Sequence, residues 1–167
     1  YRNFATKLWN ASRYCEMNNC RFDPTFKPEQ AKFIPNQWVI SEVLKTKDAI
    51  DAAMAAYKFN DAADTLYRFL WGTFCDWYLE LAKPVLMGPD TPAKAETQAS
   101  IAWARDEILK LLHPFMPHVS EELWQAMPHD GETLAMASWP RAKKASRTAP
   151  LYSHAIRTLM FPRLFPA

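Results

Sequence analysis

Apolar residues recur along the first twenty positions with the spacing of a helix. Phe4, Leu8, Ala11 and Cys15 lie four, three and four residues apart, which places them on one face of an α-helix. The positions between them are mainly polar. The pattern therefore predicts an amphipathic helix over about residues 2–21, with this stripe turned toward a core.

Two further segments keep the same period. The second helix is predicted to begin with Asn36 as its N-cap and to run to residue 59, and the third to follow a cap at Asn60 or Asp61 and to weaken or end at Pro84. Their expected apolar positions are Val39, Val43, Ile50, Met54 and Tyr57 in the second helix and Ala63, Leu66, Leu70, Phe74, Trp77 and Leu81 in the third.

Proline and polar residues separate the remaining segments. Thr91 is the expected N-cap of a fourth helix with Pro92 as its first residue, and a short fifth helix over 119–127 follows the sequence HPFMPH. The pattern favours an all-α fold, an antiparallel helical bundle of four to five helices with an irregular C-terminal tail. We expect the helical domain to cover residues 1–127, and a tail with room for one short helix at 151–160 to cover 128–167.

Composition agrees with this fold class and bounds the location. The chain has only three glycines and no run of 18 apolar residues, so no membrane span is expected. Cys15, Cys20 and Cys75 form no CxxC pair, which favours reduced thiols in a cytoplasmic protein. The chain starts at Tyr1 directly in a helical pattern, so we expect it to be a piece of a longer protein.

The net charge of +2 hides an asymmetry along the chain. Residues 1–127 hold 14 Lys and Arg against 16 Asp and Glu, whereas residues 128–167 hold 6 against 2. The helical part is therefore not a generally basic nucleic-acid binder. Any such function must rest on a local patch of side chains.

The first helix carries the best candidate for such a patch. Opposite the apolar stripe lie Arg2, Thr6, Trp9 and Arg13, and on the flank between the two faces lie Asn3, Lys7, Asn10 and Tyr14. One interpretation is a solvated face whose tryptophan packs on a neighbouring domain. The other is RNA binding, because unpaired bases stack on aromatic rings and amides and cations meet base edges and phosphates.

No catalytic cluster competes with this patch. His113 and His118 flank a proline-broken turn without the spacing or the further ligands of a metal site. Cys75 has no nearby histidine, and no glycine-rich phosphate loop is present. The sequence therefore predicts no active site in this chain.

Three strings together resemble a known family. RNFATKLWNASRY, YKFNDAADTLYRFLWGTFCDWYLELAKPVL and LLHPFMPHVSEELWQAM are similar, in order and spacing, to the helical anticodon-binding domain of class I valyl-tRNA synthetases. The block FCDWYLELAK followed by HPFMPHVSEELW is typical of the valine, isoleucine and leucine group, and KLWNASRY favours valine. The corresponding isoleucyl domain and a helical protein-interaction module are the alternatives.

The resemblance implies a function for the whole parent enzyme. Valyl-tRNA synthetases attach valine to tRNA with ATP and Mg²⁺, but their HIGH-type and KMSKS-type catalytic motifs and their editing domain are missing from this sequence. The chain itself is thus expected to be non-catalytic, without a cofactor or metal. Its implied partners are the anticodon stem-loop of the valine tRNA and the catalytic body of the same polypeptide.

The resemblance also implies site residues. In NFATKLWNASRY, Asn10 would hydrogen-bond a base, Tyr14 would stack on one, and Lys7 and Arg13 would hold phosphate or base. The full set of implied tRNA-binding residues is Asn3, Lys7, Asn10, Arg13 and Tyr14 in the first helix and Arg68 and Trp71 in the third. Lys83 is a candidate for the RNA backbone, and Arg2 and Trp9 are candidates for contact with the catalytic body.

Overall fold

The computed structural model describes residues 2–141, with side chains from residue 3 onward, and every regular element in that range is helical. The elements are α1 (Arg2–Met17), α2 (Ile34–Ala55), α3 (Phe59–Arg68), the π-helical η2 (Phe69–Tyr78), α4 (Leu79–Leu86), α5 (Pro92–Leu112) and α6 (Pro117–Gln125), with short 3₁₀ turns η1 (Pro28–Gln30) and η3 (Leu134–Met136). The predicted all-α fold is confirmed. The short helix predicted at 151–160 lies outside the described residues.

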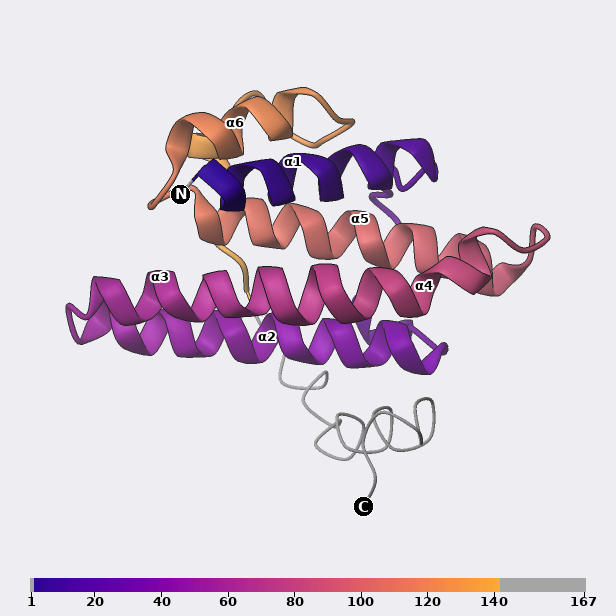
Figure 1. Ribbon diagram of the computed structural model, residues 1–167, viewed down its shortest axis with the longest axis horizontal. Coiled ribbons are helices and arrows are strands. Elements are labelled where there is room, and N and C mark those ends of the chain that lie inside the picture. The colour runs from indigo at the N-terminus through magenta and orange to yellow at the C-terminus, as the bar shows by residue number, and fades with distance from the viewer. Residues whose placement is uncertain (1, 142–167) are drawn as a thin grey trace, which may run out of the picture.

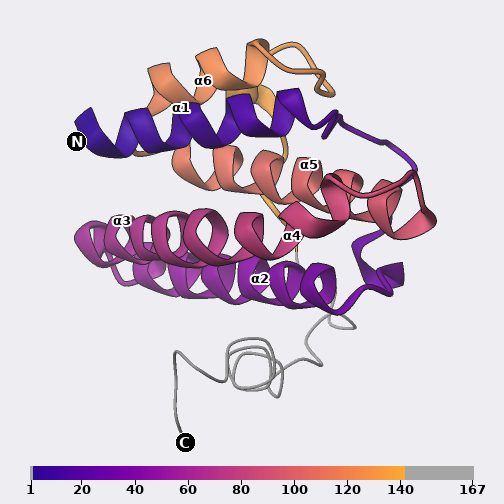
Figure 2. The same ribbon diagram turned by 45° about the vertical axis from the view of Figure 1, so that its right-hand side comes forward.

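Helix α5 is the centre of the bundle. It contacts α1 and α6 on one side and α2, α3 and α4 on the other. Figure 1 shows this order, with α1 and α6 above α5 and the remaining helices below, and the rotated view in Figure 2 agrees. None of the helices formed by residues 2–141 combines the length and apolar character needed to cross a bilayer.

Helix α1 ends earlier than its sequence predicts, at Met17 rather than near residue 21. Asn19 adopts a left-handed backbone with a φ of 56°. The Cys20 N–H then donates to the Cys15 carbonyl at 2.9 Å and the Asn19 N–H donates to the Glu16 carbonyl at 3.0 Å. This pair of bonds closes a Schellman motif, which explains the end of the helix. All four residues of the predicted stripe are buried, as expected.

The turn between α2 and α3 contradicts three predictions, the first of which is that the second helix runs to residue 59. Helix α2 ends at Ala55, and Tyr57 adopts a φ of 58° with 82% of its surface exposed, so its placement on the apolar face was wrong. Because the Lys58 N–H donates to the Ala53 carbonyl at 2.8 Å, the same Schellman geometry stops this helix. Helix α3 then begins at Phe59, which also makes the predicted cap at Asn60 or Asp61 wrong.

Asn36 is a core residue and not the predicted N-cap of α2. The helix begins two residues earlier, at Ile34, and Asn36 is fully buried. Its side-chain amide donates to the Glu96 carboxylate at 2.9 Å, and its Oδ1 accepts from the Tyr78 hydroxyl at 2.9 Å. Asn36 therefore joins α2 to α5 and η2 through buried polar contacts.

Glu96 of α5 supplies the cap that α2 lacks. No side chain of the segment before α2 caps it. The Glu96 carboxylate instead accepts from the backbone N–H groups of Lys32 at 3.0 Å and Phe33 at 2.9 Å. Burial alone would raise the pKa of Glu96, but these bonds and the one from Asn36 outweigh it, and the pKa lies below its ordinary value. A charge from one helix thus stabilises the start of another.

Helices α3, η2 and α4 follow one another without a break and form a single rod. The rod passes Pro84 and ends at Leu86, so the proline lies inside its last turn. Along it, every fourth residue is buried: Ala62, Leu66, Leu70, Phe74, Tyr78, Ala82 and Leu86. In an α-helix a step of four residues drifts about 40° past a full turn. The π-helical segment holds more residues per turn, so it offsets part of that drift.

The start of α5 agrees with the sequence, whereas α6 covers residues 117–125 and so lies two residues earlier than the predicted 119–127. Thr91 caps α5 by accepting from the Lys94 N–H at 3.2 Å, and Pro92 is the first helical residue, as predicted. Beyond α6, the Leu134 N–H donates to the Glu121 carboxylate at 2.9 Å, and the Trp139 indole N–H donates to Asp51 of α2 at 2.9 Å. Residues 128–141 therefore tie α6 to α2.

Candidate nucleic-acid interface

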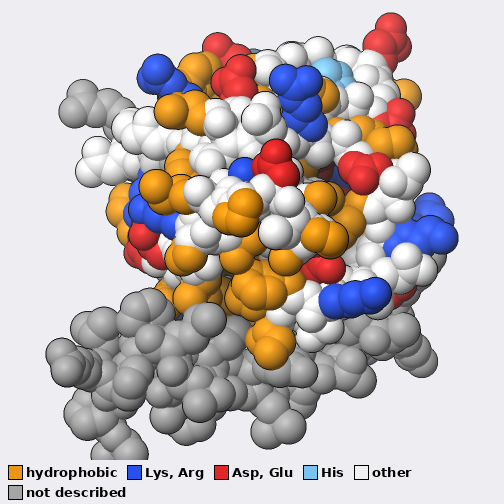
Figure 3. Space-filling view, turned by 90° about the vertical axis from the view of Figure 1, so that its right-hand side faces the viewer, with side chains coloured by type: hydrophobic (Ala, Val, Ile, Leu, Met, Phe, Trp, Pro, Cys, Tyr) orange, Lys and Arg blue, Asp and Glu red, His pale blue; other side chains and the backbone are white. Residues whose placement is uncertain are grey.

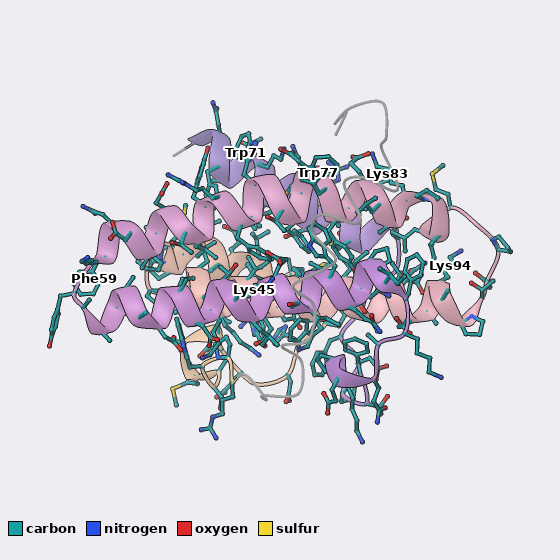
Figure 4. The ribbon with its side chains drawn as sticks, turned by 90° about the horizontal axis from the view of Figure 1, so that it is seen from below. Lys45, Phe59, Trp71, Trp77, Lys83 and Lys94 are labelled. Carbon is teal, nitrogen blue, oxygen red and sulfur yellow. The ribbon has the colours of Figure 1, made fainter. Side chains whose placement is uncertain are left out.

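The polar flank of α1 faces the α3–η2–α4 rod across an open groove of about 500 Å³. Figure 4 shows Trp71 and Lys83 along one edge of that rod. The groove, which we call the α1–α4 groove, is lined by Lys7, Asn10, Ala11 and Tyr14 from α1 and by Cys75, Asp76, Leu79, Glu80 and Lys83 from the rod.

Both cations of the α1–α4 groove are paired with carboxylates. Lys7 Nζ lies 2.6 Å from Asp76 Oδ1, and Lys83 Nζ lies 2.5 Å from Glu80 Oε1. Lys7 Nζ also lies 4.5 Å from the centre of the Trp71 ring, which gives a cation–π contact. The formal charges in the groove cancel, so it offers hydrogen-bond donors and acceptors side by side. Such a surface suits the edges of bases better than phosphates.

Tyr14 and Cys75 are neutral groups at ordinary pH. Burial, followed by the nearby Cys20 and Glu80, raises the pKa of the Tyr14 phenol. Burial raises the pKa of the Cys75 thiol to about 12. Cys75 is thus an inert part of the groove floor rather than a nucleophile. Tyr14 is half-buried, packs against the core and lines the groove together with Asn10.

The structure brings three of the predicted site residues together and separates the others. Lys7, Asn10 and Tyr14 line the α1–α4 groove, together with Lys83, which was a lesser candidate. Trp71 is half-buried beneath Lys7 and supports it from the side of the rod.

The three other predicted residues lie outside that groove. Asn3 is exposed near the start of α1 and lines a second cavity. Arg13 is exposed and makes no ion pair within residues 3–141, which leaves it the better candidate for a phosphate contact. Arg68 is largely exposed and pairs with Asp64 at 2.9 Å, a kind of surface pair that contributes little stability.

Sequence reasoning missed the acidic side of the groove. Asp76 and Glu80 lie four residues apart on one face of the rod and meet the flank of α1. The helical spacing of Asp76, Glu80 and Lys83 places all three on one face, a signal that the sequence does contain. What it could not have supplied is the pairing with Lys7, because that depends on how two helices distant in sequence pack.

The described part of the chain holds no candidate metal centre that competes with this groove. Within residues 2–141, no group of three or more His, Cys, Asp or Glu side chains is arranged to hold a metal ion. On the end of the bundle seen in Figure 3, Lys and Arg are interspersed with Asp and Glu rather than gathered by sign. The α1–α4 groove is therefore the best candidate site for a ligand with mixed donors and acceptors.

Comparison with known proteins identifies the family. Residues 36–160 match the family described as the anticodon-binding domain of tRNA ligase. Because the match begins within α2, it covers the rod side of the groove but not α1.

Curated relatives extend the similarity. Valine–tRNA ligase of Bradyrhizobium diazoefficiens is 59% identical over 140 residues, which are 84% of this chain and 15% of the relative. The valine–tRNA ligases of Bartonella henselae and Nitrobacter winogradskyi are 51% and 52% identical over 89% of this chain, or 17% and 15% of their own lengths. The chain therefore spans about a sixth of the length of these relatives. The resemblance read from the sequence is confirmed, and the chain belongs to the anticodon-binding domain family of tRNA ligases.

Proposed function

We propose that this chain is the anticodon-reading part of a valine–tRNA ligase and that the α1–α4 groove contacts unpaired anticodon bases. The observation that carries the proposal is the convergence of Lys7, Asn10 and Tyr14 with Lys83 on one accessible groove. Anticodon bases are unpaired, so both their faces and their edges are open to contact.

Each side chain has a distinct part in this recognition. Asn10 offers an amide donor and acceptor to a base edge, and Tyr14 offers its ring for stacking. The paired Lys7 and Asp76 add a further donor and acceptor. One well-placed bidentate contact supplies about 1–3 kcal/mol of discrimination between bases. Arg13, exposed beside Tyr14, holds a neighbouring phosphate.

The rest of the reaction belongs to the remainder of the polypeptide. ATP and magnesium are used by the catalytic body, whose motifs this sequence lacks. Trp9, on α1 and 45% exposed, is the side chain we assign to contact with that body. The side chain of Arg2, the other candidate, lies outside the described residues. Anticodon binding then holds the acceptor end of the tRNA in the distant active site, in the cytoplasm where tRNA is charged.

The test uses Asn10→Ala in the complete ligase. We expect kcat/KM for valine tRNA to fall by about ten-fold or more, because a base contact is lost, while valine-dependent pyrophosphate exchange stays unchanged. Gln30→Ala removes another exposed amide away from the groove and is the matched control.

Binding of isolated stem-loops tests the choice of amino acid. The complete ligase is expected to bind an anticodon stem-loop for valine more tightly than one for isoleucine, and Asn10→Ala is expected to reduce that preference. Charging kinetics equal to wild type in Asn10→Ala would show that the α1–α4 groove does not read the anticodon. A preference for the isoleucine stem-loop would instead favour the isoleucyl alternative.

A further inference from the structure

A stack of aromatic rings continues from the α1–α4 groove toward the start of α1. Lys7 lies over Trp71, the Trp71 and Tyr67 rings stack with centres 5.7 Å apart, and Tyr67 stacks on Phe4 at 5.1 Å. Tyr67 keeps 44% of its surface exposed. Because Trp71 and Phe4 stack on Tyr67, the open part of Tyr67 is mainly its ring edge, which faces the seam between α1 and the rod.

The stack ends at a second cavity, of about 730 Å³. Its floor is apolar and its rim is polar, and it lies among α1, α3 and the α5–α6 turn. The floor is formed by Phe4, Leu66, Leu112, Phe115 and Met116, with Tyr67 at the side, and the rim carries Asn3, Asn60 and Asp64. We call it the Tyr67 cavity.

We propose that the Tyr67 cavity binds one further unpaired base of the anticodon loop, of the kind that carries an exocyclic amino group. This inference rests on the proposed function of the α1–α4 groove and extends it. The base lies over the apolar floor and packs against the exposed edge of the Tyr67 ring, and Asn60 and Asp64 meet its polar edge. Asparagine pairs with adenine, and a carboxylate accepts from the amino group of cytosine.

The geometry of α1 supports a single track for the RNA. Asn3 of the cavity and Tyr14 of the groove are eleven positions apart on one flank of the helix, or about 16 Å along its axis. That length equals about five stacked nucleotides, or fewer when they are splayed. A short run of unpaired nucleotides can thus reach both sites, with the Trp71 and Tyr67 rings between them.

The rim favours a base over an apolar protein segment. Three polar side chains, two amides and a carboxylate, surround the opening. The Asp64 carboxylate forms an ion pair with the exposed Arg68, and such a surface pair exchanges readily for another partner. An apolar side chain of a protein partner would offer no hydrogen bonds to the two rim amides and the rim carboxylate.

The experiment follows single bases in the complete ligase. An anticodon stem-loop for valine carries 2-aminopurine at one loop position at a time, and its fluorescence is recorded on binding. In wild type we expect the fluorescence at one loop position to change on binding, and this position is one whose signal Asn10→Ala does not alter. In Tyr67→Leu that change is lost and Kd rises by about ten-fold, because an aromatic wall of the cavity is removed. Tyr57→Leu, the same substitution at a more exposed tyrosine that does not line the cavity, leaves both unchanged.

A second variant keeps the test valid if Tyr67→Leu disturbs the packing on Phe4. Asn60→Ala removes an exposed rim amide and is expected to weaken binding of the stem-loop several-fold without any loss of thermal stability. Binding and fluorescence equal to wild type in both Tyr67→Leu and Asn60→Ala would overturn the proposal.

The outcomes separate this inference from the proposed function. If Asn10→Ala weakens binding and the cavity variants do not, the α1–α4 groove stands and the Tyr67 cavity is not a base site. If none of the three variants alters binding, both proposals fail. If the cavity variants leave RNA binding intact but lower valine activation, the cavity docks another part of the ligase, and the inference is likewise overturned.

Discussion

The carboxylate of Glu96 provides the sharpest test of how this fold is held together. It reaches from α5 to the start of α2, where it accepts from two backbone N–H groups and from the amide of Asn36. Glu96→Gln keeps the size of the side chain but removes the charge and one of the two acceptor oxygens. The substitution therefore isolates the contribution of the charge to the capping of α2.

The magnitude follows from these contacts. A hydrogen bond to a charged group contributes about 1.5–3 kcal/mol, and a neutral one about half of that. The Lys32 N–H is exposed to water, so its bond counts for less. We expect Glu96→Gln to lower the free energy of unfolding at pH 7 by about 1–2 kcal/mol, which corresponds to a fall in Tm of about 3–6 °C for a domain of this size.

The pH dependence gives the prediction its sign. The pKa of Glu96 in the folded chain lies below its ordinary value. Its contribution to stability is therefore complete above the unfolded pKa, near 4.3, and is lost as the pH falls through the folded pKa. The difference in stability between wild type and Glu96→Gln should be constant from about pH 7 to about pH 5 and shrink below that.

Urea unfolding followed by circular dichroism at 222 nm, at several pH values, measures this difference. Glu122→Gln is the matched control, because Glu122 is exposed on α6 and should shift stability by no more than about 0.5 kcal/mol. A Glu96→Gln variant as stable as wild type at pH 7, or a difference that persists undiminished at pH 3, would refute the capping role of this carboxylate.

Two more measurements probe the rod and the groove. A Cβ at Gly72 would meet nothing within 4 Å, so Gly72→Ala should raise the free energy of unfolding by up to about 1 kcal/mol through helix propensity. A loss of stability in urea unfolding would contradict this. The pKa of Cys75 is raised to about 12, so at pH 8 iodoacetamide should label Cys75 far more slowly in the folded chain than in urea. Peptide mass analysis measures the two labelling rates, and equal rates would mean that the thiol is exposed.

The fold was readable from the sequence wherever local signals decide it. The stripe of Phe4 and Leu8 predicted the core face of α1, and Thr91 followed by Pro92 predicted the start of α5. The ends of α1 and α2 were misplaced because the residues with positive φ that stop these helices are Asn19 and Tyr57, and not the glycine that usually marks such an end in a sequence. Asn36 was misread as a cap because its partners, Glu96 and Tyr78, are distant in sequence.

The candidate groove was readable from the sequence to the extent that it lies on one helix. Projecting α1 placed Lys7, Asn10 and Tyr14 on a common flank, and the structure finds all three in one groove. The carboxylates opposite them and the stack through Tyr67 come from a helix more than fifty residues later. Such partners depend on tertiary packing, which no local pattern specifies.

The π-helical segment in the rod couples the packing of the core to the direction in which the groove carboxylates point. Its wider winding turns the core stripe and the carboxylates of Asp76 and Glu80 by a common angle, so neither can be adjusted without the other. Inserting or deleting a single residue there would rotate everything that follows by roughly a quarter of a circle. Length changes within residues 69–78 should therefore disturb the proposed base contacts and the folding together. The α4–α5 loop, in contrast, can change in length without reorienting that wall.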